Sequence, residues 1–250
     1  MLAQLRFELE TEERLGYCQS SVFQGVLMDS ICPDYATKLH ESTLHSYSQY
    51  LYFDEKLYWV VSTTDKEAYQ NIIEPLLKPE FNGFHLDKKD ADVKIVNKSL
   101  KNVNKKDLLA DFNKNVSEKY LTVEFITPTS FKSNDTYALF PDVRMFFASL
   151  MKKYSASSSE IEMCDDETLD YIEEHCSIVR YNLRSAYFPL EGSRIPAFRG
   201  QITLRFNGTS TMASYAKMLI EFGEYSGVGI KTGIGMGAIK LTVKGDNQND

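Results

Sequence analysis

The sequence predicts an α+β protein in which one order of elements (strand, helix, strand, strand, helix, strand) occurs twice. In several short segments apolar residues alternate with polar ones, as in a half-buried strand, and in others they recur every three or four residues, as on one face of a helix. The chain has 250 residues, 43% of them hydrophobic, which is enough for two units that each bury a core. We therefore expect two domains with antiparallel sheets, at 1–100 and 120–250, and a linker at 101–119.

The first unit follows this order between residues 2 and 97. We expect a strand at 2–9, a helix at 20–31, a short helix from Pro33 to about Glu41, a hairpin of strands at 45–53 and 56–62, a helix at 69–77 and a last strand at 92–97. Ser20 or Ser21 is the expected N-cap of the first helix, because a serine hydroxyl accepts from the free N–H groups of a first turn. The lysine- and asparagine-rich residues 98–106 show no strong periodicity, so we assign them to the linker.

The second unit repeats the order. We expect a strand at 120–126, a helix at 143–151, strands at 177–189 and 198–206, a helix that starts after Thr209-Ser210 and a last strand at 239–243. This twofold order is that of two tandem ferredoxin-like, or RRM-like, domains. Because this fold hosts many unrelated functions, the function has to be inferred from particular residues.

The charge of the chain is unevenly distributed. The net charge is −7, yet residues 155–175 contain eight acidic side chains and no Lys or Arg, whereas residues 177–250 contain nine Lys or Arg and five acids. One face can therefore be basic and able to bind nucleic acid although the whole chain is acidic. The acidic stretch by itself is typical of a solvated surface segment.

Several functional classes find no support in the sequence. The four cysteines form no C-x-x-C pair and the four histidines no H-E-x-x-H motif, so we expect neither a zinc site nor a disulfide framework, and no cofactor. No apolar stretch has the length of a membrane-spanning helix, and the first residues lead into a strand pattern instead of a signal peptide. A cytoplasmic protein is expected.

The most informative segment is the glycine-rich run at 227–237. Its letters, GVGIKTGIGMG, fail the Walker pattern because Ile230 stands where a glycine must precede the lysine, and they fail the Rossmann spacing as well. Two interpretations remain. The consecutive backbone N–H groups can form a nest that binds an anion, or the run is only a tight connection between a helix and a strand.

In this context the chain resembles the CRISPR-associated endoribonucleases of the RAMP superfamily, which cut precursor CRISPR RNA within its repeats. Their mark is a C-terminal loop of the type G-apolar-G…G-apolar-G, here Gly227-Val228-Gly229 and Gly233-Ile234-Gly235 with Met236-Gly237 following. Three further segments, at 32–41, 125–132 and 195–200, look like the same family, so the resemblance covers nearly the full length. It implies cleavage without a metal ion, by attack of a ribose 2′-OH that leaves a 2′,3′-cyclic phosphate and a 5′-OH.

The resemblance also implies catalytic residues in the first unit. His40 matches the family's histidine in the Leu-His-Glu context, although a histidine at a helix C-terminus can equally be an exposed residue that interacts with the helix dipole. His45 could form an acid and base pair with His40 or be a strand-edge histidine. Tyr47 is a candidate hydroxyl donor to the phosphate or a packing aromatic.

The family's full set of catalytic residues does not carry over. Several members pair the histidine with an upstream tyrosine on the first helix and a downstream lysine, but residues 22–31 contain no tyrosine and residues 42–44 no lysine. Lys38 or Lys231 could supply the charge instead. Lys152 and Lys153, at the end of a predicted helix, fit compensation of the helix dipole as well as RNA contact.

RNA contacts are expected from the glycine-rich run and from nearby cations. The expected RNA-binding residues are Gly227, Gly229, Lys231, Gly233, Gly235, Gly237, Arg194 and Arg199. Arg194 and Arg199 are predicted to bracket a hairpin tip at 192–198, although each could be a solvated surface charge. CRISPR repeat RNA is the implied partner, with effector-complex subunits and a second copy of the chain as further implied partners.

Two alternatives stay open at this point. A non-catalytic RAMP-type subunit that holds guide RNA in an effector complex would share the fold and the glycine loop, but it has no need for the pair His40 and His45. An unrelated ferredoxin-like interaction or small-ligand domain would use the glycine loop only as a turn, and it would show no salt-sensitive RNA binding.

Overall fold

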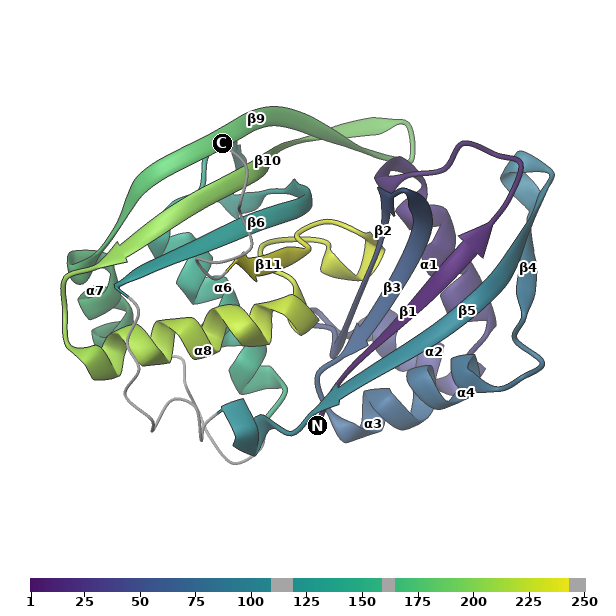
Figure 1. The fold of residues 1–250 in the computed structure, drawn as a ribbon, viewed down its shortest axis with the longest axis horizontal. Coiled ribbons are helices and arrows are strands. Elements are labelled where there is room, and N and C mark those ends of the chain that lie inside the picture. Colours follow the sequence, from purple (N-terminus) through teal and green to yellow (C-terminus); the bar gives the residue numbers. More distant parts are fainter. Residues whose placement is uncertain (109–118, 159–164, 243–250) are drawn as a thin grey trace.

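The structure is a computed structural model that describes residues 1–108, 119–158 and 165–242. It confirms two tandem ferredoxin-like units with antiparallel sheets, which lie side by side with the glycine-rich segment between them (Figure 1). No helix in these ranges is long and apolar enough to cross a membrane.

The first unit is a five-stranded sheet in the order β2-β3-β1-β5-β4, with its helices on one face. Its strands are β1 (Leu2–Glu10), β2 (Tyr47–Asp54), β3 (Lys56–Thr63), β4 (Gly83–Leu86) and β5 (Ala91–Val103). Its helices are the short η1 (Tyr17–Gln19), α1 (Ser20–Asp29), α2 (Pro33–Glu41), the successive segments α3 (Lys66–Ala68), η2 (Tyr69–Ile73) and α4 (Glu74–Leu77), and η3 (Asp87–Lys89).

Trp59 on β3 is the centre of the core of the first unit. Its ring stacks on Phe7 of β1 at 5.1 Å and meets Phe23 of α1 edge-on at 5.4 Å. Its indole N–H donates to the buried Gln49 at 3.0 Å, and the Gln49 amide in turn donates to the Ser20 carbonyl at 2.8 Å. These bonds satisfy polar groups that would otherwise be costly to bury, and they fix α1 on β2, the strand that carries Tyr47.

The second unit is a four-stranded sheet in the order β11-β6-β10-β9, covered by helices on one face. Its strands are β6 (Tyr120–Thr129), β9 (Cys176–Leu190), β10 (Ser193–Phe206) and β11 (Ile239–Thr242), and a separate small hairpin joins β7 (Phe131–Ser133) to β8 (Thr136–Ala138). Its helices are α6 (Val143–Ala156), α7 (Asp166–His175), α8 (Ser210–Ser226) and the single turn η4 (Thr232–Ile234). Thr209 caps α8 as expected, because its hydroxyl accepts from the Met212 N–H.

Four boundaries differ from the sequence prediction. β5 continues to Val103, and 105–108 is helical, so residues 98–103 belong to the first sheet and not to a linker. The remainder of the predicted linker, 109–118, lies outside the described residues. α1 begins at Ser20 itself, whose hydroxyl accepts from the Leu51 N–H of β2 and caps no helix. β10 begins at Ser193, so the turn of its hairpin with β9 is Glu191-Gly192 and not 192–198.

Candidate active site

The glycine-rich segment is a tightly packed loop between α8 and β11. Gly227, Gly229, Gly235 and Gly237 all have positive φ. A Cβ on Gly237 would lie 2.0 Å from the Val228 carbonyl oxygen, and a Cβ on Gly235 would lie 2.1 Å from Cβ of Ser20 on α1. Only glycine permits both the left-handed backbone and this close approach, so these glycines serve the packing of the loop itself.

The loop rests on the end of β6, in the segment 125–132 that contributes to the family resemblance. Gly237 N–H donates to the Pro128 carbonyl, Ala238 N–H to the Thr127 hydroxyl and Ile230 N–H to the Ser130 carbonyl. Thr127 and Ser130 are 0% and 1% exposed. This segment therefore holds the loop through two backbone carbonyls and the Thr127 hydroxyl, which accept from N–H groups of the loop in a buried setting.

Three consecutive N–H groups at the tip of the loop, those of the exposed Lys231 and the buried Thr232 and Gly233, have no acceptor within the protein as described. Most other N–H groups of the segment bond internally. Lys231 has left-handed dihedrals, φ 57° and ψ 35°, and precedes the turn η4. A left-handed residue beside a helical turn gives the backbone the form of an anion-binding nest.

This tip packs directly against the candidate catalytic residues of the first unit. A Cβ on Gly233 would lie 3.3 Å from Cδ2 of His45 and 3.0 Å from the Tyr47 hydroxyl oxygen. The rings of His45 and Tyr47 lie 5.5 Å apart, centre to centre. The fold thus brings a segment near residue 233 and a segment near residue 45 into one site.

His45 lies in the connection between α2 and β2. Its pKa is lowered, first by partial burial and then by the positive charges of His40 and Lys153. A histidine with a lowered pKa is neutral near pH 7 and can accept a proton. His40, in the last turn of α2, is exposed and lies close enough to His45 to influence it. The structure therefore brings together the two histidines that the sequence singles out.

Tyr47 is buried, whereas both histidines are exposed. Its side chain is 1% exposed, its hydroxyl accepts from the Gln24 amide at 3.4 Å, and burial raises its pKa to about 12. These contacts favour the packing role that the sequence left open, in which Tyr47 supports Gly233 and His45 from below. Lys38 ion-pairs with Glu67 on α3, so its charge is engaged at the surface.

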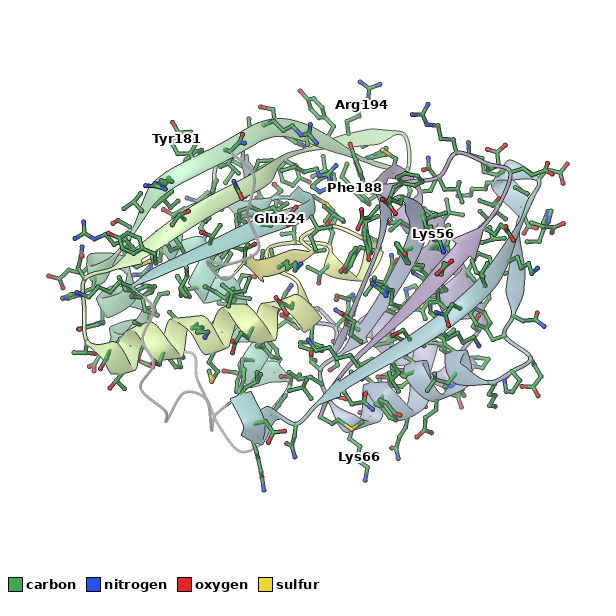
Figure 2. All side chains as sticks on the ribbon, in the orientation of Figure 1. Lys56, Lys66, Glu124, Tyr181, Phe188 and Arg194 are labelled. Carbon is green, nitrogen blue, oxygen red and sulfur yellow. The ribbon has the colours of Figure 1, made fainter. Side chains whose placement is uncertain are left out.

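Arg194 and Arg199 lie on the β9–β10 hairpin, at different depths. Arg194 is exposed next to the turn and, with Tyr181 of β9, projects outward from the hairpin (Figure 2). Arg199 points between the two units, where its guanidinium donates to the Ile126 carbonyl at 2.6 Å and lies 4.9 Å from the ring centre of Tyr17. Its Nε is buried and has no partner among the described groups.

A small apolar cluster connects this hairpin to the glycine loop. Phe188 of β9 and Ile195 and Ala197 of β10 are buried with Met236, and Ile230 and Ile234 of the loop pack against them. Ile195 and Ala197 belong to the third segment of the family resemblance. All the segments that carry the resemblance therefore converge on the glycine loop or on the histidines beside it.

Comparison with known proteins decides the family. The family model for CRISPR-associated endoribonuclease Cas6 matches residues 123–239. Cas6 of Streptococcus thermophilus is 36% identical over 225 residues, which cover 90% of this chain and 91% of that protein. The chain belongs to the Cas6 family of CRISPR-associated endoribonucleases. Cas6 of Mycobacterium tuberculosis is 35% identical over 96% of this chain and 78% of its own length.

Solved Cas6 structures share the fold. Thermus thermophilus Cas6 (TTHB231) superimposes with a TM-score of 0.72 at 22% identity, covering 97% of this chain and 98% of its own. A Cas6 (TTHA0078) product complex superimposes with a TM-score of 0.80 at 18% identity, covering 97% and 99%. At these identities the likeness concerns the arrangement of the two ferredoxin-like units.

The partners of Lys153 at this site do not follow from the sequence. Its place at a helix end fits dipole compensation or RNA contact, but its ammonium group bonds to the segment 226–232. No pattern along α6 indicates this, since the partners are two carbonyls and a hydroxyl that lie 73 to 79 residues further along the chain. Among the described residues no group of three or more His, Cys, Asp or Glu side chains is arranged to hold a metal ion.

Proposed function

We propose that the chain cleaves CRISPR repeat RNA without a metal ion, by attack of a ribose 2′-OH on the adjacent phosphorus. The products are a 2′,3′-cyclic phosphate and a 5′-OH. The observation that carries the proposal is the contact between two elements from different units: the turn at Lys231–Gly233, whose N–H groups have no acceptor among the described residues, and the histidine pair His40 and His45.

His45 is assigned as the base. Burial and the neighbouring charges lower its pKa, so it is neutral near pH 7 and accepts the proton of the 2′-OH. His40 is assigned as the acid that protonates the 5′ oxygen as it leaves. The exposed position of His40 at the end of α2 leaves its ring accessible to RNA. The departing oxygen then takes a proton instead of carrying a full negative charge.

The loop tip is assigned to the phosphate. In the transition state the two non-bridging oxygens gain charge, and fixed N–H donors aimed at them lower the barrier. The N–H groups of Lys231, Thr232 and Gly233 are suited to this, and the exposed Lys231 side chain adds a positive charge at the same place. This assignment uses the anion-nest interpretation of the glycine run.

RNA further from the cut is assigned to the β9–β10 hairpin. Residues 176–206 contain five of the eight arginines of the chain and one acid, Glu191. Arginine binds phosphate through two parallel hydrogen bonds, and positive charge of this density binds RNA in a salt-dependent way. Arg194 at the exposed turn and Arg199 between the units are the two positions we assign to RNA.

The first test is cleavage of the repeat RNA encoded beside the gene, in EDTA. We expect one cut and a 2′,3′-cyclic phosphate end. Replacement of the ribose 2′-OH at that position by hydrogen should abolish the cut and spare binding. Tight, salt-sensitive binding of the unmodified RNA without any cut would instead establish the alternative, a non-catalytic RNA-binding subunit.

The second test separates the acid from the base. A 5′-thio leaving group departs without protonation, so a variant that lacks only the acid should recover most of its rate on this substrate. We expect recovery for His40→Ala and none for His45→Ala. Recovery of His45→Ala alone would reverse the two assignments, and near wild-type cleavage of normal RNA by either variant would remove that residue from the mechanism. His85→Ala, a substitution on the exposed β4–β5 hairpin, is the control.

A further inference from the structure

Lys153 joins three segments that meet at the loop. It lies in the last turn of α6, and its ammonium group donates to the Ser226 carbonyl at 3.2 Å, the Gly227 carbonyl at 3.1 Å and the Thr232 hydroxyl at 3.1 Å. An ammonium group has three N–H donors, so these contacts use all of them. They connect the end of α8 to the turn η4 across the base of the glycine loop.

The same face of α6 holds the loop at a second point. Ser149 lies one turn before Lys153, and its hydroxyl accepts from the Gly229 N–H at 2.8 Å. Residues four apart in a helix share a face, so the side chains of Ser149 and Lys153 both contact the loop from the same side. Ser149 fixes Gly229 in the first half of the loop, and Lys153 fixes the start of the loop relative to the turn η4.

The contact with Thr232 leads directly to the catalytic centre. Thr232 precedes Gly233, which packs on His45 and Tyr47, and the Thr232 methyl group fills the space beside Gly227. The Thr232 hydroxyl is thus held from α6 while its backbone shapes the loop tip. A shift of this residue moves the N–H groups of the tip and the wall against which His45 rests.

We propose that Lys153 is a positioning residue for RNA cleavage, which acts through Thr232 and Gly233 to fix the loop tip against His45. It does not touch the RNA, because all three of its donors are occupied within the protein. This inference rests on the proposed function. Compensation of the dipole of α6, its own helix, does not explain Lys153, since the carbonyls it contacts lie at the C-terminus of α8.

The positive charge of Lys153 also affects the pKa of His45. Burial lowers the Lys153 pKa to about 7, and its charge contributes to lowering the pKa of His45 after burial and the charge of His40. The groups that face His45 are therefore His40 from α2, Lys153 from α6, and Tyr47 from β2. Removal of the Lys153 charge should raise the pKa of His45.

The experiment compares Lys153→Met with Lys152→Met, its exposed neighbour on the same helix. Single-turnover cleavage of repeat RNA is measured with the affinity for RNA that lacks the 2′-OH at the cut. For Lys153→Met we expect a rate loss on the order of 100-fold, as for a misplaced catalytic group, with affinity changed by less than about threefold. Lys152→Met should match the wild type in rate.

A second pair of variants decides the case if Lys153→Met fails to fold. Thr232→Val keeps the shape of the side chain and removes the hydroxyl that Lys153 contacts, whereas Thr232→Ser keeps the hydroxyl and removes the methyl group. We expect Thr232→Val to cleave at least about tenfold more slowly than Thr232→Ser. Equal rates for the two, or a Lys153→Met rate within threefold of wild type, would overturn the proposal.

An NMR titration of the histidine ring protons gives a readout that does not depend on cleavage. We expect the pKa of His45 to be higher in Lys153→Met than in wild type, with those of His85 and His175 unchanged. If the wild type cuts no RNA, the proposed function fails, and this shift still tests the link between Lys153 and His45. An unchanged pKa of His45 in folded Lys153→Met would break that link.

Discussion

Gly233 is a residue at which the two units touch at the proposed catalytic centre. Its φ is not in the left-handed region, so alanine is compatible with its backbone, but a Cβ would lie 3.0 to 3.3 Å from Tyr47 and His45. We expect Gly233→Ala to push His45 aside by a few tenths of an ångström and to reduce the cleavage rate about tenfold. Single-turnover kinetics measure this.

The control for Gly233 is Gly25 in α1, where a Cβ would meet nothing within 4 Å. Gly25→Ala should leave the cleavage rate unchanged and stabilise the helix by roughly 0.5–1 kcal/mol. Both unfolding free energies come from urea titrations. An unchanged rate for Gly233→Ala would show that His45 does not depend on this contact.

At the level of single residues, the sequence predicted the identity of candidate groups better than their surroundings. The alternation of polar and apolar residues along 47–53 indicates a strand. It does not indicate that Tyr47 packs against Gly233 of a loop nearly 190 residues away. In the same way, Arg199 was predicted at a hairpin tip, whereas the structure places it against Tyr17 of η1. Contacts of this range depend on how the two units meet, which local periodicity does not encode.

Among the elements, strand β10 depends on a bulge at Gly200, where it passes close to β9. The pairing of β10 with β6 shifts register between Phe198 and Gly200, φ of Gly200 is +127°, and a Cβ there would lie 2.0 Å from the Asn182 carbonyl oxygen. We expect Gly200→Ala to lower the unfolding free energy by about 2–4 kcal/mol, since backbone strain and a clash act together. Urea unfolding measures the change.

Gly192, in the turn of the β9–β10 hairpin, is the matched control. Its φ is +80°, but a Cβ would meet nothing within 4 Å, so Gly192→Ala introduces strain without a clash. A loss of roughly 1 kcal/mol is expected. If the two variants lose equal stability, close approach at Gly200 is not what requires glycine there.

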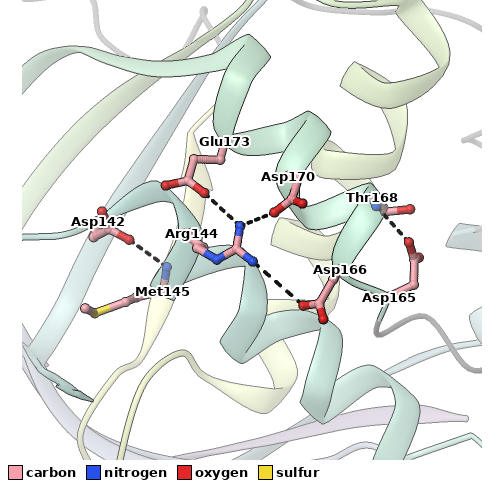
Figure 3. A network of polar contacts seen from close by, with 8 residues as sticks. All are labelled: Asp142, Arg144, Met145, Asp165, Asp166, Thr168, Asp170 and Glu173. Atoms are coloured by element: carbon pink, nitrogen blue, oxygen red, sulfur yellow. Dashed lines mark hydrogen bonds and ion pairs between the residues drawn. The ribbon is translucent and has the colours of Figure 1, made fainter. Parts of the chain in front are cut away.

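The acidic helix α7 is held to α6 by one arginine. Arg144 contacts Asp166, Asp170 and Glu173 along one side of α7, the last at 2.7 Å (Figure 3). These carboxylates raise the pKa of Arg144, which keeps it fully charged. Such exposed ion pairs are screened by salt.

We therefore expect Arg144→Met to increase amide hydrogen exchange in α7 several-fold at low salt and to leave the rest of α6 unchanged. The buried Leu169 and Ile172 still anchor the helix in the variant. At about 1 M salt, where the screening length is near 3 Å, wild type and variant should exchange alike. A difference that persists at high salt would contradict an electrostatic attachment.

The predicted end of β5 was wrong because several lysine and asparagine residues lie in the second half of this strand. The lysine- and asparagine-rich residues 98–106 favoured a linker, yet β5 pairs with β1 up to Val103. Lys98 is held by the carbonyls of Leu76 and Lys78 at 2.8 Å, so its charge is satisfied beside the sheet. A strand with one solvated face can contain many lysines, so such a strand is recognised from its pairing with a neighbouring strand and not from its own sequence.

For the whole molecule, the two lysines whose pKa values are lowered most make stability depend on pH. Burial lowers the pKa of Lys153 to about 7 and that of Lys105 to about 8. Between these values and the ordinary lysine pKa the unfolded chain binds more protons than the folded one, so the unfolding free energy rises with pH. Each such group adds at most about 1.4 kcal/mol per pH unit.

We expect the unfolding free energy of the wild type to increase from pH 7 to pH 9, as measured by urea titration at each pH. Lys153→Met and Lys105→Met should each flatten this slope, because each removes one group that loses a proton on folding. Lys152→Met should not change it. An equal slope in Lys153→Met would mean that the Lys153 ammonium keeps its proton in the fold.

The overall architecture was predictable because each unit repeats a simple hydrophobic pattern. Leu5, Phe7 and Leu9 alternate into one core, and Ile202, Leu204 and Phe206 alternate into the other, as the buried clusters show. The sequence indicated the proposed catalytic centre only as two separate segments. Their meeting depends on the junction between the units, which includes the bonds from Ser48 to the Tyr225 carbonyl and from Gln4 to the Glu224 carbonyl.

The position of β9 at the edge of its sheet has a consequence for self-association. An edge strand of 15 residues offers a row of free backbone groups to any other strand, which is a route to aggregation. Arg180 and Arg184 lie in the middle of this strand, which contains no acid. Two copies that paired β9 with β9 in antiparallel fashion would bring arginine against arginine, which like-charge repulsion disfavours. Arg180 and Arg184 therefore disfavour the pairing of β9 with a second copy of itself, and a dimer of this chain would have to form through another surface.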